Sequence, residues 1–214
     1  MNIKAKLNRF TLTLILSCAC FLGISQFQHH DIYANSALLA VEPPIEVASA
    51  TWQNATFPVE NFQSYTSPFG YRRSPVTGEV QFHNGIDMAA PFGSYIRNWW
   101  GGEIVKVAQD NTCGTHLIIE SGPWQHSYCH LNGHVEIQNN KAVMIDADGG
   151  IQLVQGQSIP TGTRIGRVGM TGRTTGPHLH WVLKLNGSYI DPAVVIREMF
   201  GQKAGLDSEA KNIG

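Results

Sequence analysis

Short runs of apolar and β-branched residues, separated by glycine and proline, make up the chain from about residue 67 onward. Runs of this length between turn residues are typical of strands in an antiparallel sheet. Two of them, residues 115–120 and 124–131, flank the turn Ser121-Gly122-Pro123 and predict a hairpin. The other runs expected to form strands are residues 102–107, 164–168 and 179–185. The pattern therefore predicts a mainly β domain.

A single short helix is expected after the last of these strands. Asp191 is a good N-cap residue, and Pro192 suits the first helical position. The apolar residues that follow continue to about residue 200, so the helix is predicted over 192–200. The polar segment 201–214 is expected to be a frayed tail.

The N-terminal 34 residues have the pattern of an export signal. Lys4, Lys6 and Arg9 precede the apolar run 10–24, and the small residue Ala34 follows. A run of about fifteen residues is short for a membrane span, so the mature chain is expected to have none. Lipoprotein processing at Cys18 and an uncleaved signal anchor are the alternatives. All three place the protein outside the cytoplasm, in the periplasm or secreted.

The remaining chain suits one domain with appendages. The full chain of 214 residues is 43% hydrophobic, which is a globular composition. We expect a linker or N-terminal lead over residues 35–66, which could cover a cleft, and a domain over 67–200. Without the signal, the chain has 12 basic residues (15 − 3) and 15 acidic residues (16 − 1), which gives a formal net charge of −3. No basic footprint for nucleic acid is present.

Two cysteines, Cys113 and Cys129, remain outside the signal. The predicted hairpin could bring their sulfurs together, and an oxidising compartment favours a disulfide. A nucleophile pair of Cys129 and His130 is disfavoured, because neighbours on a strand point to opposite faces. By the same alternation His130 would face a site only if Cys129 faced away, with Tyr128 and His126 on the side of His130.

Three short histidine motifs point to a metal site. His83 and Asp87 stand in Phe-His-Asn-Gly-Ile-Asp, His178 and His180 in Pro-His-Leu-His, and His130 lies between them. On a strand, residues at i, i+2 and i+4 share one face, so each pair can reach one surface. Catalytic zinc takes three imidazole or carboxylate ligands and keeps a fourth position open. The motifs alone leave open which residues ligate.

The segments 69–79, 83–91 and 169–180 together resemble the lysostaphin-type zinc metallopeptidases of the M23 family, and the likeness spans about residues 67–195. The resemblance implies a small antiparallel β-sheet domain, barrel-sandwich-like and with a narrow cleft, that hydrolyses peptide bonds in peptidoglycan. It further implies one zinc ion held by His83, Asp87 and His180.

The same resemblance leaves His178 and His130 for catalysis. One would act as the base for a zinc-activated water, whose pKa falls toward about 7, and the other would stabilise the tetrahedral oxyanion. The order of these two roles stays open. The chain has no His-Glu-x-x-His motif, so a thermolysin-like helix is excluded.

Some residues near the motifs have two interpretations. Arg72 could contact a substrate carboxylate or be a solvated loop arginine, and Tyr128 could orient substrate or pack in the core. Trp99 and Trp100 are expected to pack against the sheet. The connection 132–156 is longer than the family usually has, and a long loop beside a cleft can shape specificity.

Two classes of function remain. The first is an exported zinc endopeptidase that cleaves peptide cross-links of peptidoglycan, of the D-alanyl to diaminopimelate type rather than glycine bridges. The second is a catalytically silent relative that binds peptidoglycan or regulates a wall hydrolase. Retention of all five candidate residues favours the enzyme. A zinc amidase of another fold is a third, weaker alternative.

Overall fold

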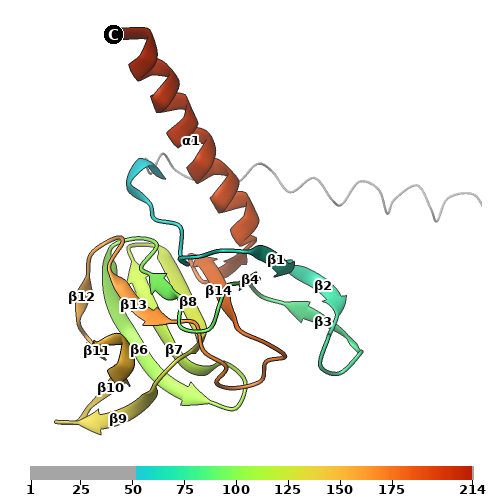
Figure 1. Ribbon diagram of the computed structural model, residues 1–214, viewed down its shortest axis with the longest axis vertical. Helices are drawn as coiled ribbons and strands as arrows, with labels where there is room; N and C mark the ends of the chain where they lie inside the picture. Colours follow the sequence, from blue (N-terminus) through green and yellow to red (C-terminus); the bar gives the residue numbers. More distant parts are fainter. Residues whose placement is uncertain (1–51, 214) are drawn as a thin grey trace, which may run out of the picture. The chain divides into compact units, whose positions relative to one another are not determined.

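The structure, a computed structural model, describes residues 52–213. The predicted signal at 1–34, including Cys18, lies outside the described residues, and so does the first part of the predicted lead. Within residues 52–213 no helix combines the length and the apolar character that a membrane crossing requires. Strands and one α-helix make up most of this part of the chain (Figure 1).

One large antiparallel sheet carries the domain. Its strands run in the order β1-β4-β14-β8-β7-β6-β12, and β15 pairs with β14. They are β1 (Ser64–Ser67), β4 (Ile86–Ala89), β6 (Gly102–Asp110), β7 (Gly114–Ser121), β8 (Trp124–Leu131), β12 (Ser158–Ile159), β14 (His178–Leu185) and β15 (Ser188–Ile190). The path ends at β1 and β12, so this sheet does not close into a barrel. The antiparallel β fold is confirmed, and the barrel-like closure is not.

Three small antiparallel sheets complete the domain. They are β2 (Gly70–Arg73) with β3 (Val80–His83), β5 (Tyr95–Arg97) with β13 (Arg164–Arg167), and β9 (His134–Gln138) with β10 (Lys141–Asp146) and β11 (Ile151–Val154). Two 3-10 turns, η1 (Trp52–Asn54) and η2 (Ala147–Gly149), accompany them. The predicted hairpin is the pair β7 and β8.

The C-terminal helix begins as predicted but is much longer. Helix α1 spans Pro192–Ile213, and the amide of Ala193 donates to the Asp191 carboxylate at 2.9 Å. The helix therefore continues through residues 201–213, where a tail was expected. Gln202 and Lys203 show why, since the first accepts from the Trp52 amide at 2.8 Å and the second donates to the Ala55 carbonyl at 2.6 Å.

Residues 52–66 are part of the folded domain and not a linker. Trp52 is 2% exposed and stacks on Trp99, with ring centroids 4.9 Å apart. Val59 pairs with Ile96 in an isolated β-bridge. None of these residues lines the pocket that contains the residues of the histidine motifs. The described part of the lead thus packs on the core and does not cover the cleft.

A tryptophan cluster fills the centre of the core. Trp99 is fully buried and contacts Trp124 and Trp181 edge to face, at centroid distances of 5.5 and 5.6 Å. Such aromatic pairs add about 0.5–1.5 kcal/mol each beyond the apolar area that they bury. The expected packing role of Trp99 is confirmed.

The long connection 132–156 is an ordered sheet and lies away from the pocket. It forms β9, β10 and β11, and none of its residues lines the main pocket. Asp146 is 2% exposed, binds Arg167 through two hydrogen bonds of 2.5 and 2.7 Å, and caps η2. The position of this connection therefore does not support a role in shaping the cleft.

Buried His126 makes the stability of the domain sensitive to acid. Burial lowers the pKa of His126 to about 3, and its ring nitrogens contact the Tyr128 and Ser121 hydroxyls at 2.8 and 2.9 Å. Below about pH 6.5 the unfolded chain takes up a proton there that the folded protein does not. The unfolding free energy should then fall by up to about 1.4 kcal/mol per pH unit on acidification.

We expect His126→Gln to remove that share of the pH dependence. Urea unfolding of metal-free parent and variant, at about pH 7.5 and about pH 5, measures it. The difference in unfolding free energy between the two proteins should shrink at the lower pH. An unchanged difference would contradict the neutral, buried state of His126.

Candidate metal centre and active site

A pocket of about 530 Å³ lies over β14, β8 and β7, and the β2–β3 hairpin and the loop before β14 contribute to its wall. Its lining brings together all five residues singled out from the histidine motifs. These are His83, Asp87, His130, His178 and His180.

Asp87 and His180 face each other across two neighbouring strands. Asp87 is on β4 and is the register partner of His180 on β14. His83 ends β3, so His83 and Asp87 do not share one continuous strand as expected from the spacing. The chain turns at Gly85, where a side chain would come within 2.9 Å of the His180 ring. This turn, rather than strand alternation, lets His83 reach Asp87.

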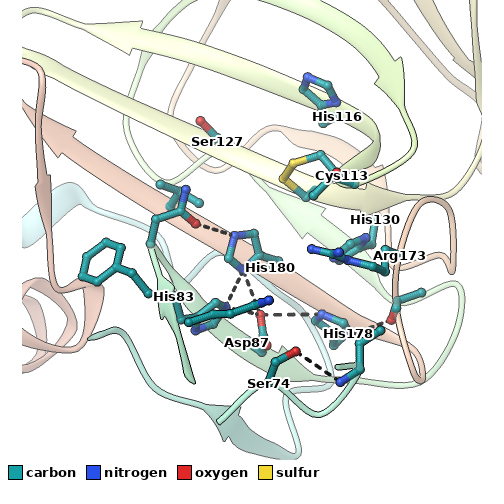
Figure 2. A pocket seen from close by; sticks show the side chains of 18 of the residues that line it. Ser74, His83, Asp87, Cys113, His116, Ser127, His130, Arg173, His178 and His180 are labelled. Carbon is teal, nitrogen blue, oxygen red and sulfur yellow. Dashed lines mark hydrogen bonds and ion pairs between the residues drawn. A yellow bond between two sulfur atoms is a disulfide. The ribbon is translucent and has the colours of Figure 1, made fainter. Parts of the chain in front are cut away.

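The three side chains converge at a single point (Figure 2). His180 Nδ1 lies 2.8 Å from Asp87 Oδ1, His83 Nε2 lies 3.0 Å from His180 Nδ1, and His83 Nε2 lies 3.2 Å from Asp87 Oδ1. One potential ligand atom from each residue thus lies within 4.8 Å of the others.

The far nitrogens of the two rings are held by oxygen acceptors. His83 Nδ1 lies 2.7 Å from the Pro68 carbonyl oxygen, and His180 Nε2 lies 3.2 Å from the Asn84 amide oxygen. A carbonyl oxygen can accept but not donate, so these nitrogens carry the protons. In the neutral imidazoles the near nitrogens, His83 Nε2 and His180 Nδ1, then present lone pairs.

The resulting donor set fits zinc. Three acceptor atoms, two of them imidazole nitrogens and one a carboxylate oxygen, face one another, and a cation relieves their repulsion. A tetrahedral ion bound at about 2.0–2.1 Å holds its ligand atoms about 3.3 Å apart. The observed spacings of 2.8 to 3.2 Å are close to that value. Carbonyl partners that fix the far nitrogens are also typical of metal-binding histidines.

His178 and His130 lie beside this triad, and each has its Nδ1 held by a backbone carbonyl. His178 shares the pocket face of β14 with His180, and its Nε2 is 3.6 Å from Asp87 Oδ1. Its Nδ1 contacts the Gly176 carbonyl oxygen at 2.8 Å. His130 Nδ1 contacts the Thr171 carbonyl oxygen at 2.9 Å. Both rings therefore keep a free nitrogen, and their centroids are 4.8 Å apart.

His130 reaches the pocket by breaking the strand alternation. Its φ is 62°, in the left-handed region, and both Cys129 and His130 line the pocket. Tyr128 and His126 are fully buried on the opposite side. The expectation that His130 faces the site only with Cys129 turned away is therefore wrong. The conclusion that the two do not form a nucleophile pair still holds, because Cys129 is bonded to Cys113 in a disulfide.

The pocket favours ionised carboxylate and neutral imidazole. Burial opposes the ionisation of Asp87, but the neighbouring imidazoles of His180 and His83 outweigh it and hold the pKa of this carboxyl far below its usual range. Burial lowers the pKa of His130 to about 4, against a smaller opposing effect of the Thr171 carbonyl. Burial likewise lowers the pKa of His180. These are the protonation states that a metal site needs.

The two candidate substrate contacts have different positions. Arg72 lines the pocket, with a guanidinium nitrogen 3.7 Å from Asp87 Oδ2. Tyr128 is fully buried, and its hydroxyl accepts from the Trp99 amide at 2.8 Å. Tyr128 is thus a core residue and cannot contact substrate as the structure stands. His116, which belongs to none of the sequence motifs, is 3% exposed and also lines the pocket.

The sequence motifs did not identify the groups that orient the histidines. Pro68, Thr171 and Gly176 act through backbone carbonyls, for which a sequence has no residue-type signal. Asn84 could have been found, because it lies inside the first motif and carries an amide.

Comparison with known proteins agrees with this geometry. The profile of the family "Peptidase family M23" matches residues 143–192, a stretch that includes His178 and His180. The chain is 33% identical over 130 residues to "DD-carboxypeptidase/endopeptidase Mpg" of Neisseria meningitidis, which covers 61% of this chain and 26% of that protein. It is 31% identical over 138 residues to "Peptidoglycan DD-endopeptidase ShyB" of Vibrio cholerae, which covers 63% of this chain and 28% of that protein.

Among solved structures, the fold is similar to a zinc-containing peptidase from Vibrio cholerae, with a TM-score of 0.51 and 30% identity. The match covers 63% of this chain and 37% of that one. The chain spans little more than a quarter of the length of the two relatives named above, 26% and 28%.

Proposed function

We propose that the chain carries a domain of peptidase family M23 and is an exported zinc endopeptidase that hydrolyses peptide cross-links of peptidoglycan. We assign His83, Asp87 and His180 as the zinc ligands and His178 and His130 as the catalytic pair. The similarity to this family in sequence and fold disfavours the alternative of a zinc amidase with a different fold.

One observation carries the proposal. The free nitrogens of His83 and His180 meet the Asp87 carboxylate at 2.8 to 3.2 Å, while oxygen acceptors hold their far nitrogens. This is a preorganised cation site with two further imidazoles beside it. Relatives named as peptidoglycan endopeptidases support the choice of substrate.

Zinc, when bound at this site, would polarise the scissile carbonyl and make a water molecule acidic enough to attack it near neutral pH. The chain's own residues then have to move protons. His178 and His130 each have a free Nε2, because Nδ1 is held by a backbone carbonyl. We assign proton transfer from water to the leaving amine to one of them, and stabilisation of the oxyanion to the other.

The position of Arg72 favours a substrate that carries a negative charge. Its guanidinium lies at the pocket wall within 3.7 Å of Asp87 Oδ2, where it can both orient that carboxylate and meet a carboxylate of a peptide stem. We retain the D-alanyl to diaminopimelate type of cross-link as the proposed bond.

A digest of isolated sacculi tests the function. Purified protein loaded with about one zinc per chain should release shortened muropeptides, which mass spectrometry identifies together with the bond that is cut. Zinc-loaded protein that leaves sacculi and cross-linked muropeptides intact would instead support the silent, wall-binding or regulatory class. Cell fractionation and the N-terminal residue of the mature protein would test export and cleavage of the signal.

Activity should depend on pH in the acid range. Burial lowers the pKa of His130 to about 4 and also lowers that of His180, so both rings stay neutral at neutral pH. Activity is present while these rings are neutral and is lost as they take up protons, so it should fall as the pH drops from about 6 toward 4. Initial rates on a purified cross-linked muropeptide across this range measure the effect. Undiminished hydrolysis at about pH 4 would contradict it.

A further inference from the structure

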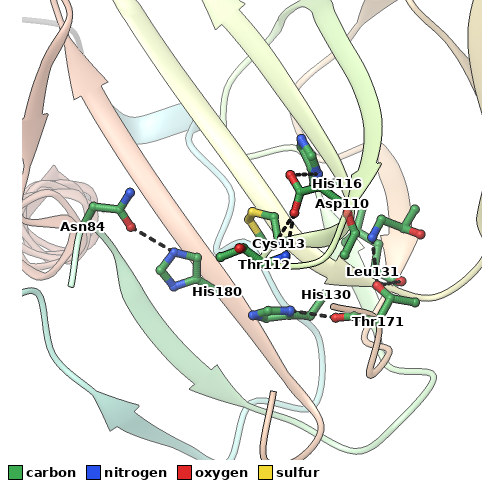
Figure 3. Close-up of a disulfide and its surroundings, with 12 residues drawn as sticks. Asn84, Asp110, Thr112, Cys113, His116, His130, Leu131, Thr171 and His180 are labelled. Atoms are coloured by element: carbon green, nitrogen blue, oxygen red, sulfur yellow. Dashed lines mark hydrogen bonds and ion pairs between the residues drawn. A yellow bond between two sulfur atoms is a disulfide. The ribbon is translucent and has the colours of Figure 1, made fainter. Parts of the chain in front are cut away.

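The Cys113–Cys129 disulfide lies in the wall of the pocket, next to His130. Both cysteines line the pocket, and Cys129 immediately precedes His130 on β8 (Figure 3). Cys113 lies in the short turn between β6 and β7. The bond therefore links the strand that carries His130 to the turn beside it.

His130 is the extra residue of a β-bulge. In the β7–β8 ladder Thr115 pairs with Leu131 and Leu117 pairs with Tyr128, so His116 alone stands opposite two residues, Cys129 and His130. The backbone of His130 is left-handed, with φ 62°, which few residues other than glycine adopt. This conformation is what turns the imidazole into the pocket.

The carbonyl of Cys113 holds this bulge. The His130 amide has no partner in the regular ladder and donates to the Cys113 carbonyl oxygen at 2.8 Å. The turn that presents this carbonyl is itself fixed from its other end. Asp110 Oδ1 accepts from the amides of Thr112 and Cys113 at 2.8 and 2.7 Å.

We propose that the disulfide is a positioning element for His130, and that its reduction slows peptide hydrolysis without releasing the metal. The inference rests on the proposed catalytic role of His130. The sulfur bridge keeps the Cys113 carbonyl within reach of the His130 amide, and the carbonyl of Thr171 separately orients the ring. Once the bridge is open, only hydrogen bonds hold the turn, and the His130 amide is more easily separated from the Cys113 carbonyl.

The metal residues do not depend on this bond. His83 and Asp87 are on β3 and β4, which do not pair with β7 or β8. His180 is the register partner of Cys129 through the backbone ladder, which a change at the sulfur leaves in place. A rate loss without metal loss is therefore the expected signature.

Reduction of the purified, zinc-loaded full-length protein tests the proposal. A water-soluble phosphine is the reductant, since dithiols compete for zinc; with one water molecule it converts the disulfide to two thiols and becomes the phosphine oxide. We expect kcat on a cross-linked muropeptide to fall by about 100-fold, with KM within about twofold and the zinc content unchanged. Reoxidation should restore the rate.

The matched control is the variant Cys113→Ala/Cys129→Ala. It should have the low kcat of the reduced parent with and without phosphine, which also controls for Cys18 and Cys20. Equal kcat for the oxidised parent, the reduced parent and the variant would overturn the proposal. Zinc loss on reduction would overturn it as well.

Amide hydrogen exchange separates this proposal from the proposed function, because it needs no turnover. Exchange at the His130 amide should become about tenfold faster or more when the disulfide is absent, while the core amides of Trp181 and Leu117 stay protected and report an intact fold. If the oxidised protein has no hydrolytic activity, the proposed function fails and the exchange result still decides whether the bond positions His130. Unchanged exchange at His130 would overturn the positioning role.

Discussion

The His180→Ala protein is expected to bind zinc more than about 100-fold more weakly than the parent protein and to lose hydrolysis of cross-linked muropeptides. Loss of a group that merely orients a metal ligand typically weakens binding by about 10- to 100-fold, and the loss of a ligand itself should cost more. The substitution removes His180 Nδ1, which lies 2.8 Å from Asp87 Oδ1 and 3.0 Å from His83 Nε2. Two ligand atoms remain, too few for a catalytic zinc site.

Chelator competition measures the zinc affinity of this variant, and the muropeptide digest measures its activity. His134→Ala is the matched control, because His134 is on β9, has a side chain that is 56% exposed and does not line the pocket. It should keep parent affinity and rate. A His180→Ala protein that retains tight zinc binding would remove His180 from the ligand set.

The sequence indicated which residues come together better than it indicated their geometry. The motifs around His83, Asp87, His178 and His180 identify residues that the structure brings into one pocket. The i and i+2 spacing of His178 and His180 predicts a shared strand face, and both lie on the pocket face of β14. Local spacing succeeds there because the strand is regular.

The same reasoning failed where the backbone is irregular. Alternation along β8 predicts that Cys129 and His130 face opposite sides, but the left-handed residue at 130 turns both into the pocket. Histidine carries no signal for such a conformation, and a bulge depends on the pairing of two strands. The helix end was also missed, since contacts of Gln202 and Lys203 with residues 52–55 extend it past residue 200.

Two segments at the edge of the domain are also more ordered than the sequence predicted. Residues 52–66 have the composition of a lead, yet Trp52 stacks on Trp99 and makes this segment part of the core. The connection 132–156 has turn residues but forms three paired strands. Trp52 and Trp99 are far apart in the chain, so no local pattern could indicate their contact. The three strands of 132–156 instead pair with their neighbours in the chain across short turns, which turn residues alone did not distinguish from a loop.

His178 and His180 are two residues apart on one strand, and their variants should nevertheless behave differently. We expect His178→Ala to keep zinc and to lose about 10²- to 10⁴-fold in kcat, the range for removal of a positioned proton-transfer group. Its Nε2 lies 3.6 Å from Asp87 Oδ1, compared with 2.8 Å for His180 Nδ1, so it lies beside the ligand triad and not within it.

Zinc content and kcat measured on the same preparation distinguish the roles of these residues. His130→Ala should match His178→Ala in zinc content and also lose rate, because both rings keep a free nitrogen toward the pocket. Zinc loss in His178→Ala together with zinc retention in His180→Ala would reverse the assignment of ligand and catalyst, and the triad would have to be rebuilt around His178.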